Sequence, residues 1–319
     1  LKARTFVFEN VKGLTVGKHK TFLKELAAAF DAAGYQVRLP WKVLNAGNYG
    51  TPQSRERLIL MGARKGETLP DYPEPTTNVA GRKKRLPNLA DGPTCTDALG
   101  DLPDADSFEA LIDGDAVKPR RFGKPSAYAA EMRCTSNDAW GFGYVREWDP
   151  SLLTSSARTG HTEISRRRFA ETEPGSVEPI SRFFKLPEQG VSNTLRAGTD
   201  GARGAFTSPR PIHYRYNRCV TVREMARLPG FPDWFRFQST PRLAPEIDIV
   251  RIRLVVVSVK VARRLVHASH HQSADHPLDR PAILDKLIRQ VIKQFGVTGS
   301  FPVDAKIVRR TDEPRTEQV

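Results

Sequence analysis

Two stretches near the start of the chain, Phe6–Val11 and Asn48–Arg57, carry the polar residues best suited to chemistry. The first, Phe6–Val11, is an apolar run that ends in a carboxylate and an amide, Glu9 and Asn10. The second ends in three polar side chains: Gln53, Arg55 and Arg57. An apolar run that ends in polar groups predicts a buried strand whose tip carries a site in an open α/β sheet. An acid there also commonly caps the next turn, so for Glu9 alone both roles stay open.

The elements between and after these stretches predict how they are held. A helix is expected from Lys18 to Ala33, because apolar residues recur at helical spacing and Gly34 supplies a stop. Gln36–Leu44 alternates and reads as one strand, with one face formed by Val37, Leu39, Trp41 and Val43. Leu58–Ala63 predicts a further apolar strand. This order is typical of the second half of a doubly wound sheet, and we expect the two polar stretches to form one active-site wall.

Composition limits the class of protein. The 319 residues carry a formal net charge of +14, which indicates a polyanionic partner. No apolar run approaches the roughly 18 residues that span a bilayer, and no signal peptide is apparent. The sequence has three cysteines: Cys95, Cys134 and Cys219. Their odd number and wide spacing favour a reducing compartment over a disulfide framework. We expect a cytoplasmic, prokaryotic and nucleoid-associated protein.

From about Arg64 the pattern changes to proline, glycine and charge, which predicts a second and less regular domain. Arginines stand out in it and could follow a phosphate backbone: Arg166, Arg167, Arg168, Arg196, Arg203, Arg210, Arg215 and Arg218. A charged run is also often only a solvated face. Near its end, Thr221–Leu228 predicts a short helix with a capping threonine and an early glutamate, closed by Pro229 and Gly230.

The segment from Val220 to Phe235 resembles the ninth motif of the DNA (cytosine-5)-methyltransferases. Phe8–Val11 resembles their sixth motif and Gln53–Arg57 their eighth. Three further segments are also similar to members of that family: Asp97–Pro103, Ser192–Thr199 and Ser208–His213. The set follows the family's order and spacing from about Phe6 to Phe237, so the chain is identified as a member.

The resemblance implies an α/β fold: the C-terminal part of a Rossmann-like, S-adenosylmethionine-dependent methyltransferase sheet, plus an irregular, mostly β target-recognition domain. The expected division is a partial catalytic domain over 1–75 and the target-recognition domain, with the ninth motif, over 76–240. A degraded return to the catalytic domain follows over 241–268, and a C-terminal extension over 269–319. In the extension a group of histidines reads as a solvated linker, and no metal site is expected.

Such enzymes flip a cytosine out of duplex DNA, add a cysteine thiolate to C6 and methylate C5 from S-adenosylmethionine. By motif match, the carboxyl group of Glu9 would hydrogen-bond N3 of the base, and Asn10 would help to hold the loop. Arg57, with Arg55 behind it, would bind the O2 edge and a neighbouring phosphate.

The resemblance also suggests which residues meet DNA and which brace the fold. DNA contacts are expected from Gln53, Thr194, Leu195, Arg196, Arg203 and Arg210. Gln53 would in addition shape its loop. Arg223 and Glu224 are expected to brace the target-recognition domain rather than touch substrate.

The chain departs from the family at both ends. The glycine-rich cofactor loop and the Pro-Cys nucleophile loop, which in the family precede the Glu-Asn-Val strand, are not found, and no cysteine here follows a proline. The final family motif is reduced to Ser258–Leu265, so most of the S-adenosylmethionine site is expected to be missing. Because the chain begins with Leu1 and runs straight into a strand, we expect sequence to be missing on that side.

These observations predict a methyltransferase fragment or subunit from a restriction-modification system, inactive alone, that binds double-stranded DNA. Three accounts of the missing half stay open. A second chain could supply the N-terminal catalytic half, the gene product could be truncated or decayed, or the chain could be a DNA-binding module without catalysis. The recognition sequence does not follow from the residues, because base contacts depend on loop geometry.

Overall fold

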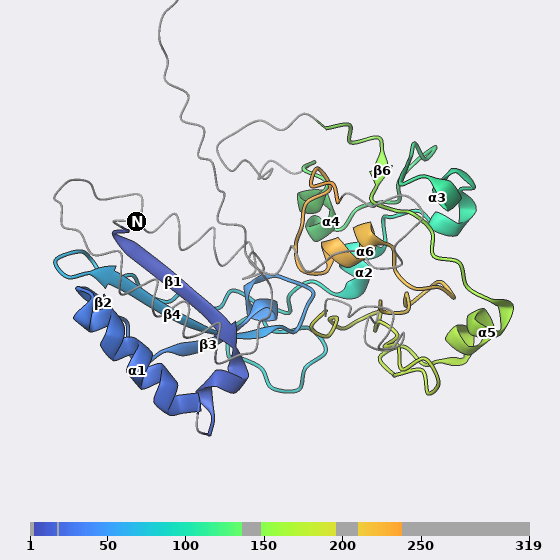
Figure 1. The fold of residues 1–319 in the computed structure, drawn as a ribbon. Helices are drawn as coiled ribbons and strands as arrows, with labels where there is room; N and C mark the ends of the chain where they lie inside the picture. Colours follow the sequence, from blue (N-terminus) through green and yellow to red (C-terminus); the bar gives the residue numbers. More distant parts are fainter. Residues whose placement is uncertain (1–2, 18, 136–147, 196–209, 238–319) are drawn as a thin grey trace, which may run out of the picture. The chain divides into compact units, whose positions relative to one another are not determined.

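The computed structural model describes residues 3–17, 19–135, 148–195 and 210–237, which are the coloured parts of Figure 1. All of them belong to one compact unit, Ala3–Asp275. None of the helices within these residues is long and apolar enough to cross a membrane.

A four-stranded sheet is built around its last strand. β4 (Glu56–Arg64) pairs antiparallel with β1 (Thr5–Val11) on one side, and with β2 (Tyr35–Val37) and β3 (Lys42–Asn45) on the other. β1, β2 and β3 therefore run in the same direction, and β4 lies between them in the opposite one (Figure 1). The predicted strand–helix–strand order and the predicted last strand are both confirmed.

Helix α1 (His19–Ala32) covers one face of this sheet, as Figure 1 shows. The ring of Phe6 on β1 stacks on that of Phe30, with 4.1 Å between centroids. Gly62 on β4 leaves the room for this contact, because a Cβ there would lie within 2.2 Å of the Phe6 ring. Gly34 follows the helix with φ +87°, a backbone conformation that favours glycine. The predicted helix and its glycine stop are confirmed.

The strand predicted over Gln36–Leu44 is wrong in one respect, since it is two strands. β2 ends at Val37 and β3 begins at Lys42, and the register against β4 shifts by two residues between them. Pro40 lies in the gap and has no N–H to donate to a ladder, so the pairing cannot continue through it. Leu39, expected on one face with Val37, Trp41 and Val43, is 57% exposed.

The strand that carries Glu9, β1, was predicted to be buried, and this prediction is also wrong. Val7 is 49% exposed and Val11 is 55% exposed, because α1 covers only the opposite face of β1. On the face of the sheet that carries Val7 and Val11, it is β4 that is covered, because its residues Ile59 and Met61 pack against Tyr72. Within the described part of the chain, β1 is thus an edge strand with one covered and one open face.

The described residues beyond the sheet form short helices and coil. Their helices are α2 (Cys95–Leu99), α3 (Ala110–Asp113), α4 (Ala127–Met132), α5 (Glu163–Glu171) and α6 (Val222–Arg227). Their named strands are only β5 (Ala116–Val117) and β6 (Leu153–Thr154), and Ala105–Ser107 forms a single-turn 3-10 helix. Two further 3-10 helices, Lys12–Thr15 and Ala46–Tyr49, follow β1 and β3 of the sheet. The expected irregularity is present, but the expectation of a mostly β domain does not hold here.

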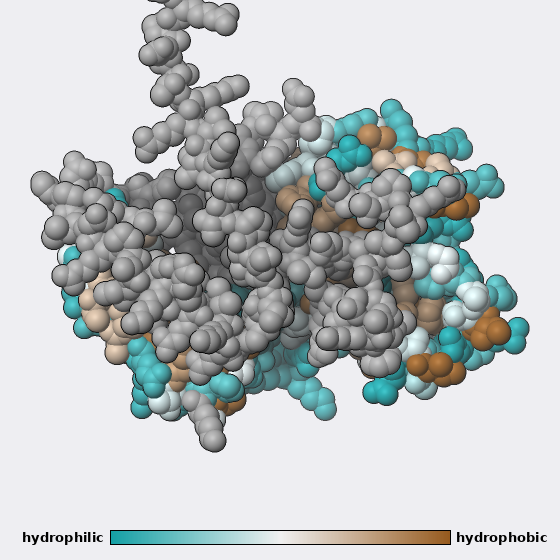
Figure 2. Space-filling model, viewed as in Figure 1, coloured by the Kyte–Doolittle hydropathy of each residue, from teal (hydrophilic) through white to brown (hydrophobic). Residues whose placement is uncertain are grey.

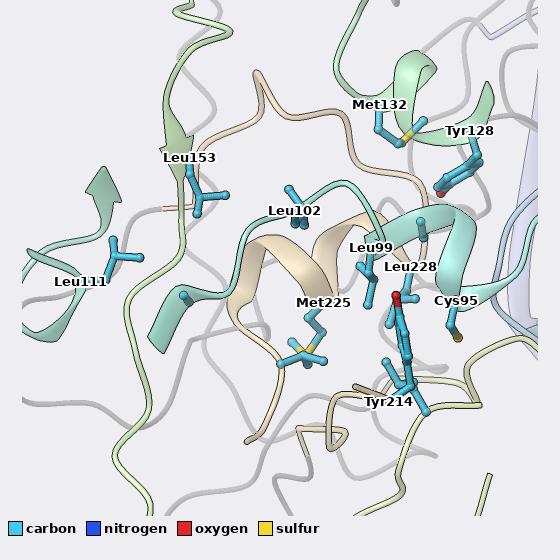
Figure 3. Packing of buried hydrophobic residues seen from close by; sticks show 14 residues of the cluster. Cys95, Leu99, Leu102, Leu111, Tyr128, Met132, Leu153, Tyr214, Met225 and Leu228 are labelled. Carbon is cyan, nitrogen blue, oxygen red and sulfur yellow. The ribbon is translucent and has the colours of Figure 1, made fainter. Parts of the chain in front are cut away.

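The described residues after β4, from 65 to 237, are called the second part of the chain below. One apolar cluster holds this second part together. Leu99 of α2, Tyr128 and Met132 of α4, and Met225 of α6 point into it (Figure 3). α6 begins at a capping box in which Thr221 and Glu224 bond each other's backbone N–H groups. The helix predicted over Thr221–Leu228 is confirmed, and its start follows from that local sequence.

Candidate active site at the end of strand β1

Glu9 meets two arginines at the end of the sheet. Nε of Arg57 lies 2.8 Å from Oε1 of Glu9, and Nη2 of Arg55 lies 4.0 Å from the same oxygen. All three side chains are partly exposed, at 31% for Glu9 and 17% for each arginine. The structure therefore brings together the carboxylate and both guanidinium groups that the sequence singled out, in a position that solvent can reach.

The register of the sheet explains this meeting. Glu9 lies directly opposite Ile59, and Arg57 lies opposite Val11. Glu9 and Arg57 are thus diagonal neighbours on one face of an antiparallel pair, within reach of long side chains. A shift of one residue would turn one partner to the other face, so the hydrophobic pattern of β4 also sets the ion pair.

The charges of the site are unequal, with two guanidinium groups against one carboxylate. Burial, and after it the charge of Arg57, lower the pKa of Arg55 to about 10, while the charge of Glu9 opposes the shift. Arg55 remains a cation at neutral pH. A planar, donor-rich cluster of this kind suits a phosphate or the polar edge of a base.

Side-chain amides hold the two loops of the site, and sequence reasoning found only one of them. Oδ1 of Asn10 accepts from the N–H of Val11 at 2.8 Å. Oδ1 of Asn45 accepts from the N–H of Gly47 at 3.0 Å and from that of Arg55 at 3.1 Å. Asn45 thereby closes the loop that presents Arg55. An asparagine at the end of a strand and two residues before a loop glycine is a typical turn signal that could have identified it.

The same loop is joined to the segment that was expected to contact DNA. The N–H of Ser54 donates to the carbonyl of Ser192 (2.8 Å), and the N–H of Ser192 donates to that of Pro52 (3.0 Å). The hydroxyl of Thr194 donates to the carbonyl of Ser54 (3.0 Å). Gln53 lies within this junction and is only 1% exposed. In this conformation Gln53 is buried in the junction, and its expected DNA contact and loop-shaping role both stay predictions.

The other expected DNA contacts are spread over different environments. Arg196 and Arg203 lie outside the described residues. Leu195 is partly buried against the apolar cluster of the second part. Arg210 donates through Nη1 to the hydroxyl of Thr159 at 2.7 Å, and burial lowers its pKa. Among those of these residues that the structure describes, Thr194 is the one that bonds the loop of Arg55.

The residues expected to brace the fold lie in its interior. Arg223, 1% exposed, donates to the carbonyl oxygens of Thr154, Pro232 and Phe235. Glu224 accepts from both Nη atoms of Arg218 at 2.8 Å. Burial would raise the pKa of Glu224, but the charge and hydrogen bonds of Arg218 outweigh it and bring the pKa to about 2. These contacts support a structural role for both residues.

Sequence reasoning counted Arg218 among the surface cations, and the structure corrects this, since its side chain is only 2% exposed. It also missed Arg227, which is fully buried between Asp101 and Asp233. Nη2 of Arg227 lies 2.6 Å from Asp233, and Nη1 donates to Asp101. Part of the arginine excess thus serves the core of the second part and does not face a partner.

The cysteines are poor candidates for a nucleophile. Cys95 and Cys219 are buried, and burial raises the pKa of each thiol to about 12. Both belong to apolar clusters of the second part, and Cys134 packs against one of them. A thiolate is the reactive form, so the two buried thiols are inert at neutral pH.

The described residues also give little that suits S-adenosylmethionine. Around Glu9 they offer charged groups that face one another and two exposed valines. A cavity of about 540 Å³ lies in the second part, lined by three carboxylates and three arginines together with Tyr216 and Asn217. Figure 2 shows hydrophobic residues beside hydrophilic ones on the side where Figure 1 places α5, whereas the lining of the cavity itself is polar or charged apart from Ala170. Such a lining does not suit an adenine ring, for which pockets are mostly apolar.

Comparison with known proteins places the chain in a family. The family model described as "C-5 cytosine-specific DNA methylase" matches residues 1–268. The chain is 58% identical over 240 residues to Type II methyltransferase M.XorII of Xanthomonas oryzae pv. oryzae, across 75% of this chain and 53% of that protein. It is 32% identical over 299 residues to Type II methyltransferase M.AgeI of Thalassovita gelatinovora, across 75% of this chain and 68% of that protein.

Among solved structures, a putative DNA modification methyltransferase encoded within a prophage (E. coli) resembles the chain with a TM-score of 0.54. That match has 22% identity and covers 84% of this chain and 71% of the other, so it bears on the fold alone. The chain spans about half the length of M.XorII. The ordered polar stretches, the paired Glu9 and Arg57, and the match over most of its length show that the chain belongs to the C-5 cytosine-specific DNA methylase family.

Proposed function

We propose that the chain is the part of a DNA (cytosine-5)-methyltransferase that holds the target cytosine, and that the methyl-transfer half of the active site comes from elsewhere. The observation that carries this proposal is the meeting of Glu9, Arg55 and Arg57 at the end of β1 and β4. Membership of the family supports the substrate class. The relatives named as Type II methyltransferases support a restriction-modification setting.

In this proposal the three side chains bind one flipped base. A cytosine offers N3 and O2 on its polar edge, and Glu9 in its protonated form would donate a hydrogen bond to N3. Arg57 would turn from Glu9 to O2, and Arg55 would neutralise a neighbouring phosphate. Fixed donors aimed at the ring would stabilise the charge that develops there when a nucleophile attacks C6.

The second part of the chain is proposed to read the DNA. On this view residues 1–75 belong to the catalytic domain and residues 76–240 to the target-recognition domain. Thr194 and Leu195, with Arg196, Arg203 and Arg210, would then approach the duplex. Hydrogen bonds from Ser192 and Thr194 to the loop of Arg55 support a link between the two parts.

The nucleophile and most of the cofactor site are proposed to come from a second polypeptide. S-adenosylmethionine would supply the methyl group. The two buried thiols of Cys95 and Cys219 argue against a nucleophile at those positions, since both resist ionisation. The chain by itself is then a DNA-binding protein that does not methylate.

Two measurements on the whole chain test this proposal. Mobility shift on duplex DNA is expected to show binding that weakens as salt is raised, because phosphate contacts release counterions. Transfer of tritiated methyl groups from S-adenosylmethionine is expected to be absent. Turnover by the isolated chain would refute the need for a second polypeptide, and lack of any affinity for duplex DNA would refute the proposed substrate.

A further inference from the structure

Four consecutive cations form the tip of a loop between β4 and α2 that the proposed function has not used. They are Arg82, Lys83, Lys84 and Arg85, and all four residues are exposed. Nη1 of Arg85 lies 2.8 Å from a carboxylate oxygen of Asp91. Among the described residues, no carboxylate pairs with Arg82, Lys83 or Lys84. Three positive charges are therefore left uncompensated at this tip.

The loop is held in shape by the side chain of Asn78, which is only 1% exposed. Its Nδ2 donates to the carbonyls of Leu86 (3.1 Å) and Leu89 (2.6 Å), and its Oδ1 accepts from the N–H of Leu86 (2.6 Å). The N–H of Asn78 donates to the carbonyl of Ala90 at 2.7 Å. Gly81 turns the chain just before the cations with φ +73°, a conformation that favours glycine. Because the loop is closed in this way, little backbone ordering is needed when its cations bind a partner.

The base of this loop is bonded to the loop that presents Arg55. Oγ1 of Thr77 donates to the carbonyl of Gly47 (2.9 Å) and accepts from the N–H of Gly50 (3.1 Å). Val79 packs on Gly47, where an added Cβ would come within 3.0 Å of its methyl groups. The basic tip is thus tied by direct contacts to the proposed base-binding site.

Charge complementarity indicates which partner suits the tip. The phosphate backbone of a DNA duplex carries one negative charge for about every 1.7 Å of its length, and lysine binds phosphate as a point charge. Several arginines of the second part cannot serve in this way, because they are buried: Arg218, Arg223 and Arg227. The tip is therefore one of the places where the positive charge of the chain reaches solvent.

We propose that Arg82, Lys83 and Lys84 bind the phosphate backbone of duplex DNA beside the target cytosine, as a contact that does not depend on base sequence. This contact would add affinity and hold the duplex while the base lies at Glu9. The inference rests on the proposed function and deepens it, since it adds a holding site outside the segment that begins at Thr194.

The test measures binding of the whole chain to two DNA duplexes of unrelated sequence over a range of salt concentrations. The double variant Lys83→Gln, Lys84→Gln removes two charges from the tip and leaves Asn78 in place. Lys20→Gln, Lys24→Gln is the matched control, because it removes the same two charges from exposed positions on α1. Circular dichroism checks that each variant is folded.

The tip variant is expected to bind both duplexes about tenfold more weakly, or weaker still, at low salt. The slope of log affinity against log salt should become shallower by about 2, because two phosphate contacts no longer release counterions. The control should keep the affinity and the salt slope of the wild type.

Acetylation followed by mass spectrometry gives a second readout on the unaltered chain. Duplex DNA should slow the modification of Lys83 and Lys84 and should leave that of Lys20 and Lys24 unchanged. A residue that only supports the fold would show no such protection.

Several outcomes would overturn the inference while the proposed function stands. They are equal affinity and salt slope for the tip variant and the control, acetylation of Lys83 and Lys84 that DNA does not slow, and a loss confined to one duplex. Full DNA affinity of the tip variant, together with weaker co-purification of the part of M.XorII outside the match, would assign the tip to a protein partner and refute the DNA contact.

Failure of the proposed function gives different results. If the wild type binds neither duplex, the proposed substrate is wrong and the inference falls with it. If the isolated chain transfers methyl groups while the tip variant loses DNA affinity as expected, the need for a second polypeptide is refuted and the phosphate contact stands.

Discussion

Glu9 and Arg57 are diagonal partners across β1 and β4, with Nε of the arginine 2.8 Å from Oε1 of the carboxylate. Their motifs predicted that they share one site, and the antiparallel register of β1 on β4 creates the direct contact between them. The pair lies at the end of an edge strand and remains partly exposed, so a substrate can reach it. Substitutions at this ion pair can therefore test its chemistry without removing a buried contact on which the fold depends.

Glu9→Gln tests the proposed proton donor in the complex that completes the enzyme. The amide keeps the shape of the side chain but cannot transfer a proton, so methyl transfer should fall by about 10²–10⁴. Affinity for duplex DNA should stay within about twofold. Glu25→Gln on the exposed side of α1 is the control and should leave the rate unchanged. Equal rates for Glu9→Gln and the wild type would remove Glu9 from the mechanism.

Asn45→Ala tests the clamp that presents Arg55. The substitution leaves the N–H groups of Gly47 and Arg55 without their acceptor, and the free energy of unfolding should fall by about 1–2 kcal/mol. Urea unfolding measures the loss. Asn217→Ala, at an exposed position, should stay within about 0.5 kcal/mol of the wild type. A loss no larger than that of the control would show that the clamp is dispensable.

Arg227→Met tests the buried ion network of the second part. It leaves Asp101 and Asp233 without their shared cation, and breaking a buried pair in this way costs about 3–5 kcal/mol. The midpoint of denaturant unfolding should drop accordingly. Arg167→Met on the exposed face of α5 has no such cost and should change stability by less than about 0.5 kcal/mol. Similar stabilities for the two variants would contradict the structural reading of Arg227.

His213 predicts a loss of stability in mild acid. Burial lowers its pKa from 6.5 to about 4, although the carboxylate of Glu224 opposes the shift. A depressed pKa means that the unfolded chain binds the proton first, so this stability is complete above about pH 6.5 and is lost as the pH falls toward 4. Between pH 7 and pH 5 the loss should be about 2 kcal/mol.

His213→Asn separates this effect from the others. An amide oxygen can still accept from the N–H groups of Arg215 and Tyr216, which now bond Nδ1 of the histidine. Denaturant unfolding of the variant at pH 7 and pH 5 should therefore show a smaller pH dependence than the wild type. The same dependence in both proteins would mean that other groups cause the acid loss.

Local signals in the sequence were enough for several elements. The helical spacing before Gly34 predicted α1, the apolar run predicted β4, and Thr221 with Glu224 predicted the start of α6. Caps, glycine stops and apolar runs act within a few residues, so they can be read without the fold. The family followed from the order of the motifs, which is also a property of the sequence alone.

Only the tertiary structure decided what depends on contacts between distant residues. It split Gln36–Leu44 around Pro40, turned β1 into an edge strand, and moved Gln53 and Arg218 from an expected surface into the interior. The amino-acid type gives a residue's chemistry, but burial and partners decide whether that chemistry serves packing or substrate. Glu9, Arg55 and Arg57 were identified from the sequence by their motifs, whereas the direct contact of Glu9 with Arg57 and the partial exposure of both side chains come from the register of β1 on β4.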